Sequence, residues 1–176
     1  MSGNAGEPMH QLPPARLVRT SHTEDGKSII SSDSDMPSFS PFGPQGSSFA
    51  VFDVRNSIPV TNTDPISSFS NTLPRCPPGG SVFCITDIKP GGRAPMHRTQ
   101  SIDYCIVLSG EIVIQLDGGE QRTVRSGEFI VQQGVNHQWI NEAQETCRIA
   151  FVMLGAQEIV LSDGLALEEA VFQGQK

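Results

Sequence analysis

The stretch of sequence that decides the fold is residues 90–141, which read PGGRAPMHRTQSIDYCIVLSGEIVIQLDGGEQRTVRSGEFIVQQGVNHQWIN. Short runs of alternating or apolar residues follow one another here, and glycine-containing turns separate them. This pattern is typical of short strands joined by tight turns, so it predicts an all-β barrel or sandwich. Two of the chain's four histidines, His97 and His137, each stand at the start of an expected strand.

Proline usage shows how far the sheet extends on either side of this stretch. Eight of the thirteen prolines lie between Pro37 and Pro78, and none follows Pro95. Because proline removes a backbone donor from the sheet, continuous strands are expected after residue 95 and mainly edge strands before residue 80. Strands are expected at 15–22, 27–32, 47–54, 81–88, 102–108, 111–117, 120–125, 128–133, 137–141 and 146–154.

The chain divides into four parts on the same grounds. We expect a disordered tail, an extension with edge strands and loops, the barrel itself and a C-terminal tail, in residues 1–14, 15–80, 81–156 and 157–176. Within the extension, Asp25-Gly26 predicts a hairpin turn and residues 33–46 a loop. In the C-terminal tail, LALEEAVF (165–172) indicates a short helix.

Charge and cysteine usage exclude several classes of protein. The net charge of −7 and the scattered basic residues argue against a nucleic-acid binder. No apolar run approaches the ~20 residues of a membrane span, and the N-terminus has no signal-like apolar segment, so a cytoplasmic protein is expected. The four cysteines show no C-x-x-C spacing, and Cys84, Cys105 and Cys147 lie in apolar strand patterns, which predicts reduced thiols.

Side chains that could take part in catalysis or bind a metal are expected to lie close to the two histidines. His97 and Thr99 are two residues apart and therefore point the same way on an extended segment. Asp103 and Cys105 alternate onto one face of the next strand, and His137 can meet them because neighbouring strands lie only about 5 Å apart. Two imidazoles and one carboxylate inside a barrel suit a divalent metal such as iron, manganese, nickel or zinc.

The spacing of these residues resembles that of the cupins. The first cupin motif, G-x5-H-x-H-x3,4-E-x6-G, is met by Gly91, His97, Thr99, Asp103 and Gly110 at every interval. Thr99 replaces the second histidine of this motif, and Asp103 replaces its glutamate. The end of the second motif, G-x5-P-x-G-x2-H-x3-N, is met by Gly134, His137 and Asn141. Its leading glycine, Gly127, is one residue too close, and Gln132 stands at the position of its proline.

The resemblance implies a cupin β-barrel, also called a double-stranded β-helix or jelly roll, with an N-terminal strand-containing extension. It implies that His97, Asp103 and His137 occupy three of the four metal-ligand positions, although the metal can be absent. Small single-domain cupins of this kind often accompany natural-product biosynthetic genes, and such proteins are commonly homodimers.

Structural roles for the same residues are the alternative. The two histidines can be hydrogen-bonded to carbonyl groups without any chemistry, and Asp103 can cap the turn at Gln100-Ser101. Tyr104 and Trp139 are expected to face the second sheet or a dimer partner, away from the pocket.

An enzyme of specialised metabolism is the favoured interpretation, acting on a small organic acid or polyketide-like molecule. The expected reaction is that of a lyase or isomerase, with a metal or with His97 or His137 as the base. Thr99, Asp103 and Cys105 are expected to contact the small-molecule substrate. An iron-dependent dioxygenase and a non-catalytic ligand-binding cupin remain open.

Overall fold

A computed structural model describes residues 11–170, and all regular elements in this range are β-strands. This confirms the all-β class. The strands are β1 (Ala15–His22), β2 (Ser28–Met36), β3 (Ser48–Arg55), β4 (Ser81–Ile88), β5 (Ser101–Ser109), β6 (Glu111–Leu116), β7 (Gln121–Arg125), β8 (Phe129–Gln133), β9 (His137–Ile140), β10 (Cys147–Gly155), β11 (Ile159–Val160) and β12 (Ala166–Leu167).

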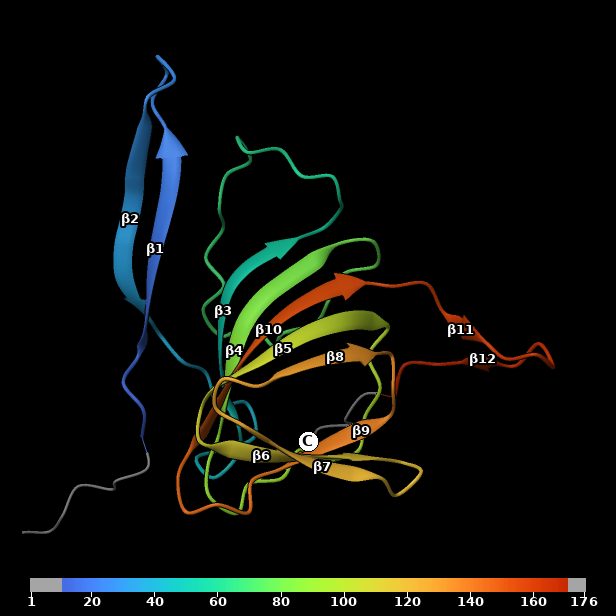
Figure 1. Cartoon of the computed structure of the whole chain (residues 1–176). Coiled ribbons are helices and arrows are strands. Elements are labelled where there is room, and N and C mark those ends of the chain that lie inside the picture. The colour runs from blue at the N-terminus through green and yellow to red at the C-terminus, as the bar shows by residue number, and fades with distance from the viewer. Residues whose placement is uncertain (1–10, 171–176) are drawn as a thin grey trace, which may run out of the picture.

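Two antiparallel sheets form the barrel. The larger has the order β3-β4-β10-β5-β8 and the smaller the order β7-β6-β9. Figure 1 shows the larger sheet arching over the smaller one, as in a jelly roll. β3 lies at one edge of the larger sheet, so the N-terminal extension supplies an edge strand to it.

Side-chain alternation explains why the two sheets close on each other. Along β5, Asp103, Cys105 and Val107 are buried, while Tyr104 between them is 46% exposed on the outer face. The inward side chains of both sheets make one apolar core between them. Its buried members are Val51, Val82, Cys84, Ile88, Cys105, Val107, Ile112, Val124, Trp139, Cys147, Ile149, Phe151 and Met153. The four cysteines are free thiols, as the sequence predicted.

Asn141, the last residue of the second motif, links three backbone groups at one end of the barrel through side-chain hydrogen bonds. Its amide nitrogen donates to the carbonyls of Ile88, at 2.7 Å, and Glu145, at 2.8 Å, and its side-chain oxygen accepts from the backbone N–H of Ala143. Asn141 is fully buried, so these bonds satisfy backbone groups that water cannot reach. The motif asparagine therefore has a structural role here.

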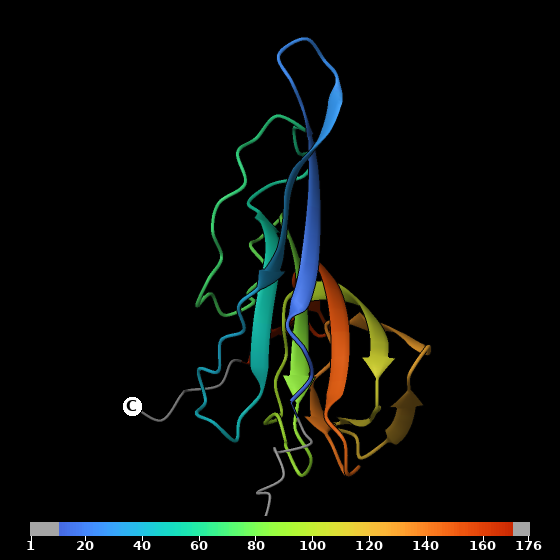
Figure 2. The same ribbon diagram turned by 90° about the vertical axis from the view of Figure 1, so that its left-hand side faces the viewer.

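β1 and β2 form a separate antiparallel hairpin, which confirms the turn predicted at Asp25-Gly26. Gly26 adopts a φ of 82°, the left-handed conformation that such a turn requires. In Figure 2 the hairpin lies in front of the larger sheet and rises beyond it. The loop predicted at 33–46 begins later, because β2 continues to Met36 through its pairing with Ala15.

The C-terminal tail is extended, and the helix predicted from residue 165 is absent from residues 165–170. Asp163-Gly164 turns the chain between β11 and β12, and Gly164 has a φ of 85°. An Asp-Gly turn between two apolar runs favours a hairpin over a helix. Ala170 then bridges Arg98, and residues 171 and 172 lie outside the described residues. Across residues 11–170 there is no helix that is long and apolar enough to cross a membrane.

Candidate functional site

The two motif histidines meet, as the barrel topology predicted. His97 lies in the segment before β5, and His137 begins β9. Their backbones form an antiparallel bridge in which each N–H donates to the other's carbonyl, at 2.8 and 2.9 Å. This pairing places the two imidazole ring centroids 4.2 Å apart, with the ring planes at 48°.

Hydrogen bonds to carbonyl groups fix the tautomer of both rings. Nδ1 of His97 lies 2.9 Å from the carbonyl oxygen of Pro95, and Nδ1 of His137 lies 3.0 Å from that of Val135. A carbonyl oxygen only accepts, so Nδ1 carries the proton in each case. In the neutral ring the lone pair is then on Nε2, the atom that a base or a metal ligand uses.

Burial keeps the two rings neutral. His137 is only 2% exposed, and its burial, followed by the proximity of His97, lowers its pKa from 6.5 to about 4. Burial also lowers the pKa of His97, against the opposing effect of hydrogen bonds with Pro95 and His137. A buried imidazolium cannot gain the hydration that would stabilise its charge in water, which explains the direction of both changes. Near neutral pH both rings are uncharged bases.

Asp103 lies on the inner face of β5 within its own set of hydrogen bonds. The Ser101 hydroxyl donates to Asp103 Oδ1 at 2.6 Å, and the Gln132 amide donates to Asp103 Oδ2 at 3.1 Å. Thr99 is linked to the set because its hydroxyl oxygen lies 3.0 Å from that of Ser101. Asp103 is 3% exposed, and burial raises its pKa from 3.8 to about 6, although the bond from Ser101 opposes the rise. Its carboxyl group can therefore change protonation state close to neutral pH.

Cys105 follows Asp103 inward on the same strand. It is 1% exposed, and its thiol contacts the Asp103 carbonyl oxygen at 3.8 Å. Burial, with the nearby Asp103 carboxyl, raises the pKa of the thiol. The thiol is therefore protonated and apolar in character, which suits packing better than nucleophilic chemistry.

Two residues that sequence reasoning did not assign to the site contact it. Gln132 holds Asp103, and its own Oε1 is buried without a hydrogen-bond partner among the residues that the structure describes. The sequence did offer an indication of Gln132, because it stands where the second motif has a proline. Trp139 packs edge-on against His137, with ring centroids 5.5 Å apart, and against Phe151 of the larger sheet at 6.0 Å. Trp139 thus faces the second sheet, as expected, but it is not directed away from the site, because it also covers one of the two imidazoles.

The metal centre implied by the resemblance was tested against these contacts. Within residues 11–170, no group of three or more histidine, cysteine, aspartate or glutamate side chains is placed to hold a metal ion. The two imidazoles are adjacent, but both Asp103 oxygens accept hydrogen bonds from Ser101 and Gln132. The residues present therefore do not fit a three-ligand centre, and the acid–base chemistry proposed below uses protein side chains alone.

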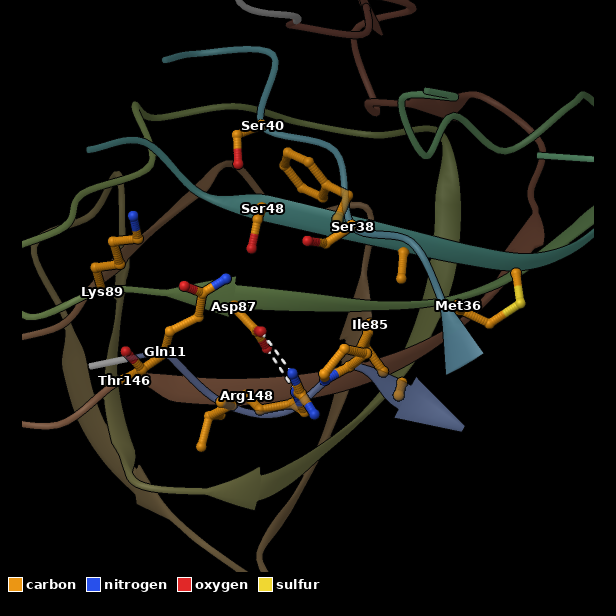
Figure 3. Close-up of a pocket in the computed structure, with 15 residues that line it drawn as sticks. Gln11, Met36, Ser38, Ser40, Ser48, Ile85, Asp87, Lys89, Thr146 and Arg148 are labelled. Carbon is orange, nitrogen blue, oxygen red and sulfur yellow. Dashed lines mark hydrogen bonds and ion pairs between the residues drawn. The ribbon is translucent and has the colours of Figure 1, made fainter. Parts of the chain in front are cut away.

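A cavity of about 120 Å³ lies elsewhere, between the hairpin and the outer face of the larger sheet (Figure 3). Its charged side chains are already paired. Arg148 makes two 2.7 Å bonds to Asp87, and the Lys89 ammonium donates to the Pro44 carbonyl. Because these groups satisfy one another and neither histidine lines the cavity, we assign it to the packing of the hairpin on the barrel.

Comparisons with known proteins agree with this architecture. The family model described as "Cupin domain" matches residues 84–164. "Phomopsin biosynthesis cluster protein C'" of Diaporthe leptostromiformis is 43% identical over 113 residues, which are 61% of this chain and 60% of that protein. "Cupin-domain-containing oxidoreductase fogC" of Aspergillus ruber is 30% identical over 156 residues, which are 84% of this chain and 77% of that protein.

A solved structure supports the same fold. The cupin domain of Schizosaccharomyces pombe Cnp3 superposes with a TM-score of 0.51 at 10% identity, over 80% of this chain and 87% of that one. The chain spans about 60% of the length of the phomopsin relative, whereas the Aspergillus ruber relative is matched over most of both proteins. By its motifs, its two facing sheets and these matches, the chain belongs to the cupin family.

Proposed function

We propose that this cupin is an enzyme of specialised metabolism that moves a proton on a small organic substrate, with His97 and His137 as its acid–base pair. The observation that carries the proposal is the pair of adjacent imidazoles whose Nδ1 protons are held by backbone carbonyls. This arrangement leaves the basic lone pair of each neutral ring on Nε2. A base with that geometry can abstract a proton next to a carbonyl or carboxyl group.

The metabolic setting is supported by the relatives. One is named as a phomopsin biosynthesis cluster protein, and another as an oryzines biosynthesis cluster protein of Aspergillus oryzae. Their names place those proteins in the biosynthesis clusters of phomopsin and of the oryzines. A comparable role for this chain would give the two histidines a small organic substrate.

Two features of the site support proton transfer. His137 is buried beside Trp139, so few waters compete with a substrate for its Nε2. The carboxyl group of Asp103, with a pKa of about 6, can supply or accept a proton near neutrality. Groups whose environments push their pKa values apart are a common basis for assigning an acid and a base. On this basis His137 removes the proton, His97 assists it, and Asp103 with Thr99 and Cys105 lines the substrate side.

Isomerisation results when the abstracted proton returns to a different carbon, and dehydration when a hydroxyl group leaves as water after the abstraction. Decarboxylation results when the carbanion left by carbon dioxide takes up the proton from the imidazole. Oxidation is a second candidate, because relatives of this chain in Aspergillus ruber and Neurospora crassa are named cupin-domain-containing oxidoreductases. That reaction requires an oxidant such as molecular oxygen, and in the form of an iron-dependent dioxygenase it would also require metal ligands beyond the two imidazoles. The two candidates predict different changes in the composition of the substrate.

Deleting the gene in its own organism should therefore cause one small molecule to accumulate, and purified full-length protein should convert it. Loss of carbon dioxide, loss of water or rearrangement at constant mass, without oxygen consumption, supports the acid–base enzyme. Oxygen consumption with an oxidised product supports the second candidate. Tight binding of the compound without any conversion would reject both enzymes in favour of a binding protein.

Elemental analysis of the same preparations provides the necessary check on the metal. We expect the metal content to be sub-stoichiometric and equal in the wild type, His97→Ala and His137→Ala. A stoichiometric divalent metal that is lost in both variants would replace the acid–base mechanism with a metal-centred one.

A further inference from the structure

Gln132 carries a buried oxygen atom that has no partner within the part of the chain that the structure describes. The residue lies on β8 and is 3% exposed, and its side-chain nitrogen donates to Asp103 Oδ2 at 3.1 Å. Its oxygen, Oε1, is buried and accepts no hydrogen bond from residues 11–170. Buried polar atoms in folded proteins are almost always paired, so we expect Oε1 to have a partner that these residues do not supply.

Asp103 decides which end of the Gln132 amide is left open. Both oxygens of Asp103 accept hydrogen bonds, Oδ1 from the Ser101 hydroxyl at 2.6 Å and Oδ2 from Gln132. A carboxylate only accepts, so the nitrogen of the amide faces it and the oxygen does not. Donation to a carboxylate also polarises the amide, which makes Oε1 a stronger acceptor. The open atom is therefore an oxygen whose direction is fixed by Asp103.

This oxygen belongs to the inner face of the larger sheet, opposite the histidine pair. Gln132 pairs directly with Asp103 of β5, whose side chain is buried between the sheets. Only residues 134–136 connect β8 to β9, and β9 begins in the smaller sheet with His137. Facing sheets pack about 10 Å apart. One small molecule between them can therefore reach both Gln132 and His137.

The hydroxyl groups beside Asp103 use their protons within the site. Ser101 has one hydroxyl proton, which it donates to Asp103. The Thr99 hydroxyl lies 3.0 Å from that of Ser101, so Thr99 is the donor in this second bond. Neither proton is left for a ligand, whereas Oε1 of Gln132 is left as an acceptor. The polar set therefore offers a bound molecule an acceptor for one of its own protons.

We propose that Gln132 Oε1 accepts a hydrogen bond from a hydroxyl group of the substrate, so that the enzyme selects hydroxylated compounds. The inference rests on the proposed function, because it requires the substrate to lie between the two sheets. A hydroxyl group donates while remaining uncharged, whereas an ammonium group would bring its charge into a buried interior. His137 then acts on the acidic C–H bond, and Gln132 determines which compounds bind.

Equilibrium binding to the purified full-length protein tests this selection. The probes are acetophenone and its 3-hydroxy and 4-hydroxy derivatives, neutral ketones that differ only in one hydroxyl group. We expect the wild type to bind at least one hydroxylated ketone about tenfold tighter than acetophenone, because acetophenone leaves Oε1 buried and unpaired. This comparison uses the wild type alone and does not depend on how any variant folds.

Gln132→Met identifies the residue that causes the preference. Methionine has a similar length but lacks the amide, so we expect this variant to bind all three ketones equally. The matched control is Gln133→Met, because Gln133 is the next residue of β8 and lies exposed on its other face. It should keep the wild-type preference. A purely structural role for Gln132 would lower the thermal stability, or the affinity for all three ketones by one factor, and would leave the preference unchanged.

Three results would overturn the proposal: equal binding of the ketones to the wild type, binding of none of them, or a preference that survives Gln132→Met. A buried water would then be the partner of Oε1.

The compound that accumulates in the deletion strain separates this inference from the proposed function. It should carry a hydroxyl group whose methylation weakens its binding to the wild type. Conversion of a compound that has no hydroxyl group would reject the role of Gln132 and keep the enzyme. Binding through a hydroxyl group without any conversion would reject the enzyme and keep the role of Gln132.

Discussion

His137→Gln is expected to slow conversion of the accumulated substrate by about 10²–10⁴-fold, the usual contribution of a positioned general base. Glutamine retains a side chain of similar length but has no basic lone pair on nitrogen. The loss should appear mainly in kcat, because the proton is transferred in the transition state. Steady-state kinetics on the compound that accumulates in the deletion strain measures it.

His22→Gln serves as the control for this experiment. His22 lies at the end of β1 on the exposed hairpin, remote from the paired rings in the sequence and in the fold. It should retain wild-type kcat and KM. If His137→Gln also retained full activity with its fold intact, His137 would not be the base, and a structural role for the histidine pair would be the correct one.

Asp103→Asn is expected to gain stability relative to the wild type as the pH rises. Burial raises the pKa of Asp103 from 3.8 to about 6 in the folded state. A group with a raised folded-state pKa stabilises the fold below its unfolded pKa, and this contribution is lost as the pH rises through the folded value. Between pH 4 and pH 7 the unfolding free energy of Asp103→Asn should therefore rise relative to that of the wild type by about 2 kcal/mol.

His137 changes stability in the opposite direction over nearly the same range. Its pKa falls from 6.5 to about 4, so its contribution is present above the unfolded value and is lost as the pH falls through the folded value. The two effects offset each other in the wild type, and Asp103→Asn should expose the acid sensitivity that His137 causes. Urea unfolding at several pH values measures this. Parallel stability profiles for the variant and the wild type would mean that Asp103 has an ordinary pKa.

Most of the barrel could be predicted because its strands alternate and its turns contain glycine. The pattern in β5 correctly placed Asp103 and Cys105 on one face, which is the inner one. Tyr104, which was expected to face the second sheet or a dimer partner, lies on the outer face and therefore does not face the second sheet. The helix from residue 165 was wrong in residues 165–170, since the Asp163-Gly164 turn outweighed the weak helical pattern that follows it. Local turn chemistry is stronger evidence than a short apolar period.

The meeting of the two histidines was predictable, whereas the contacts of Asp103 were not. Motif spacing brought His97 and His137 together correctly. It could not show that Gln132 and Ser101 would hold both oxygens of Asp103, because hydrogen bonds between strands depend on register. The packing of the hairpin along the larger sheet could not be predicted either, because the sequence of each of its strands indicates only an edge strand.

The protonation state of His137 is the most direct test of the acid–base pair. Long-range proton–nitrogen NMR spectra of labelled protein, recorded through an acid titration, report the tautomer and the pKa of each imidazole. We expect His137 to carry its proton on Nδ1 and to remain neutral until the pH approaches its pKa of about 4. An Nε2–H tautomer at neutral pH would contradict the proposed base, because the lone pair on Nε2 would then be lost. Titration near the ordinary value of 6.5 would contradict the burial of the ring.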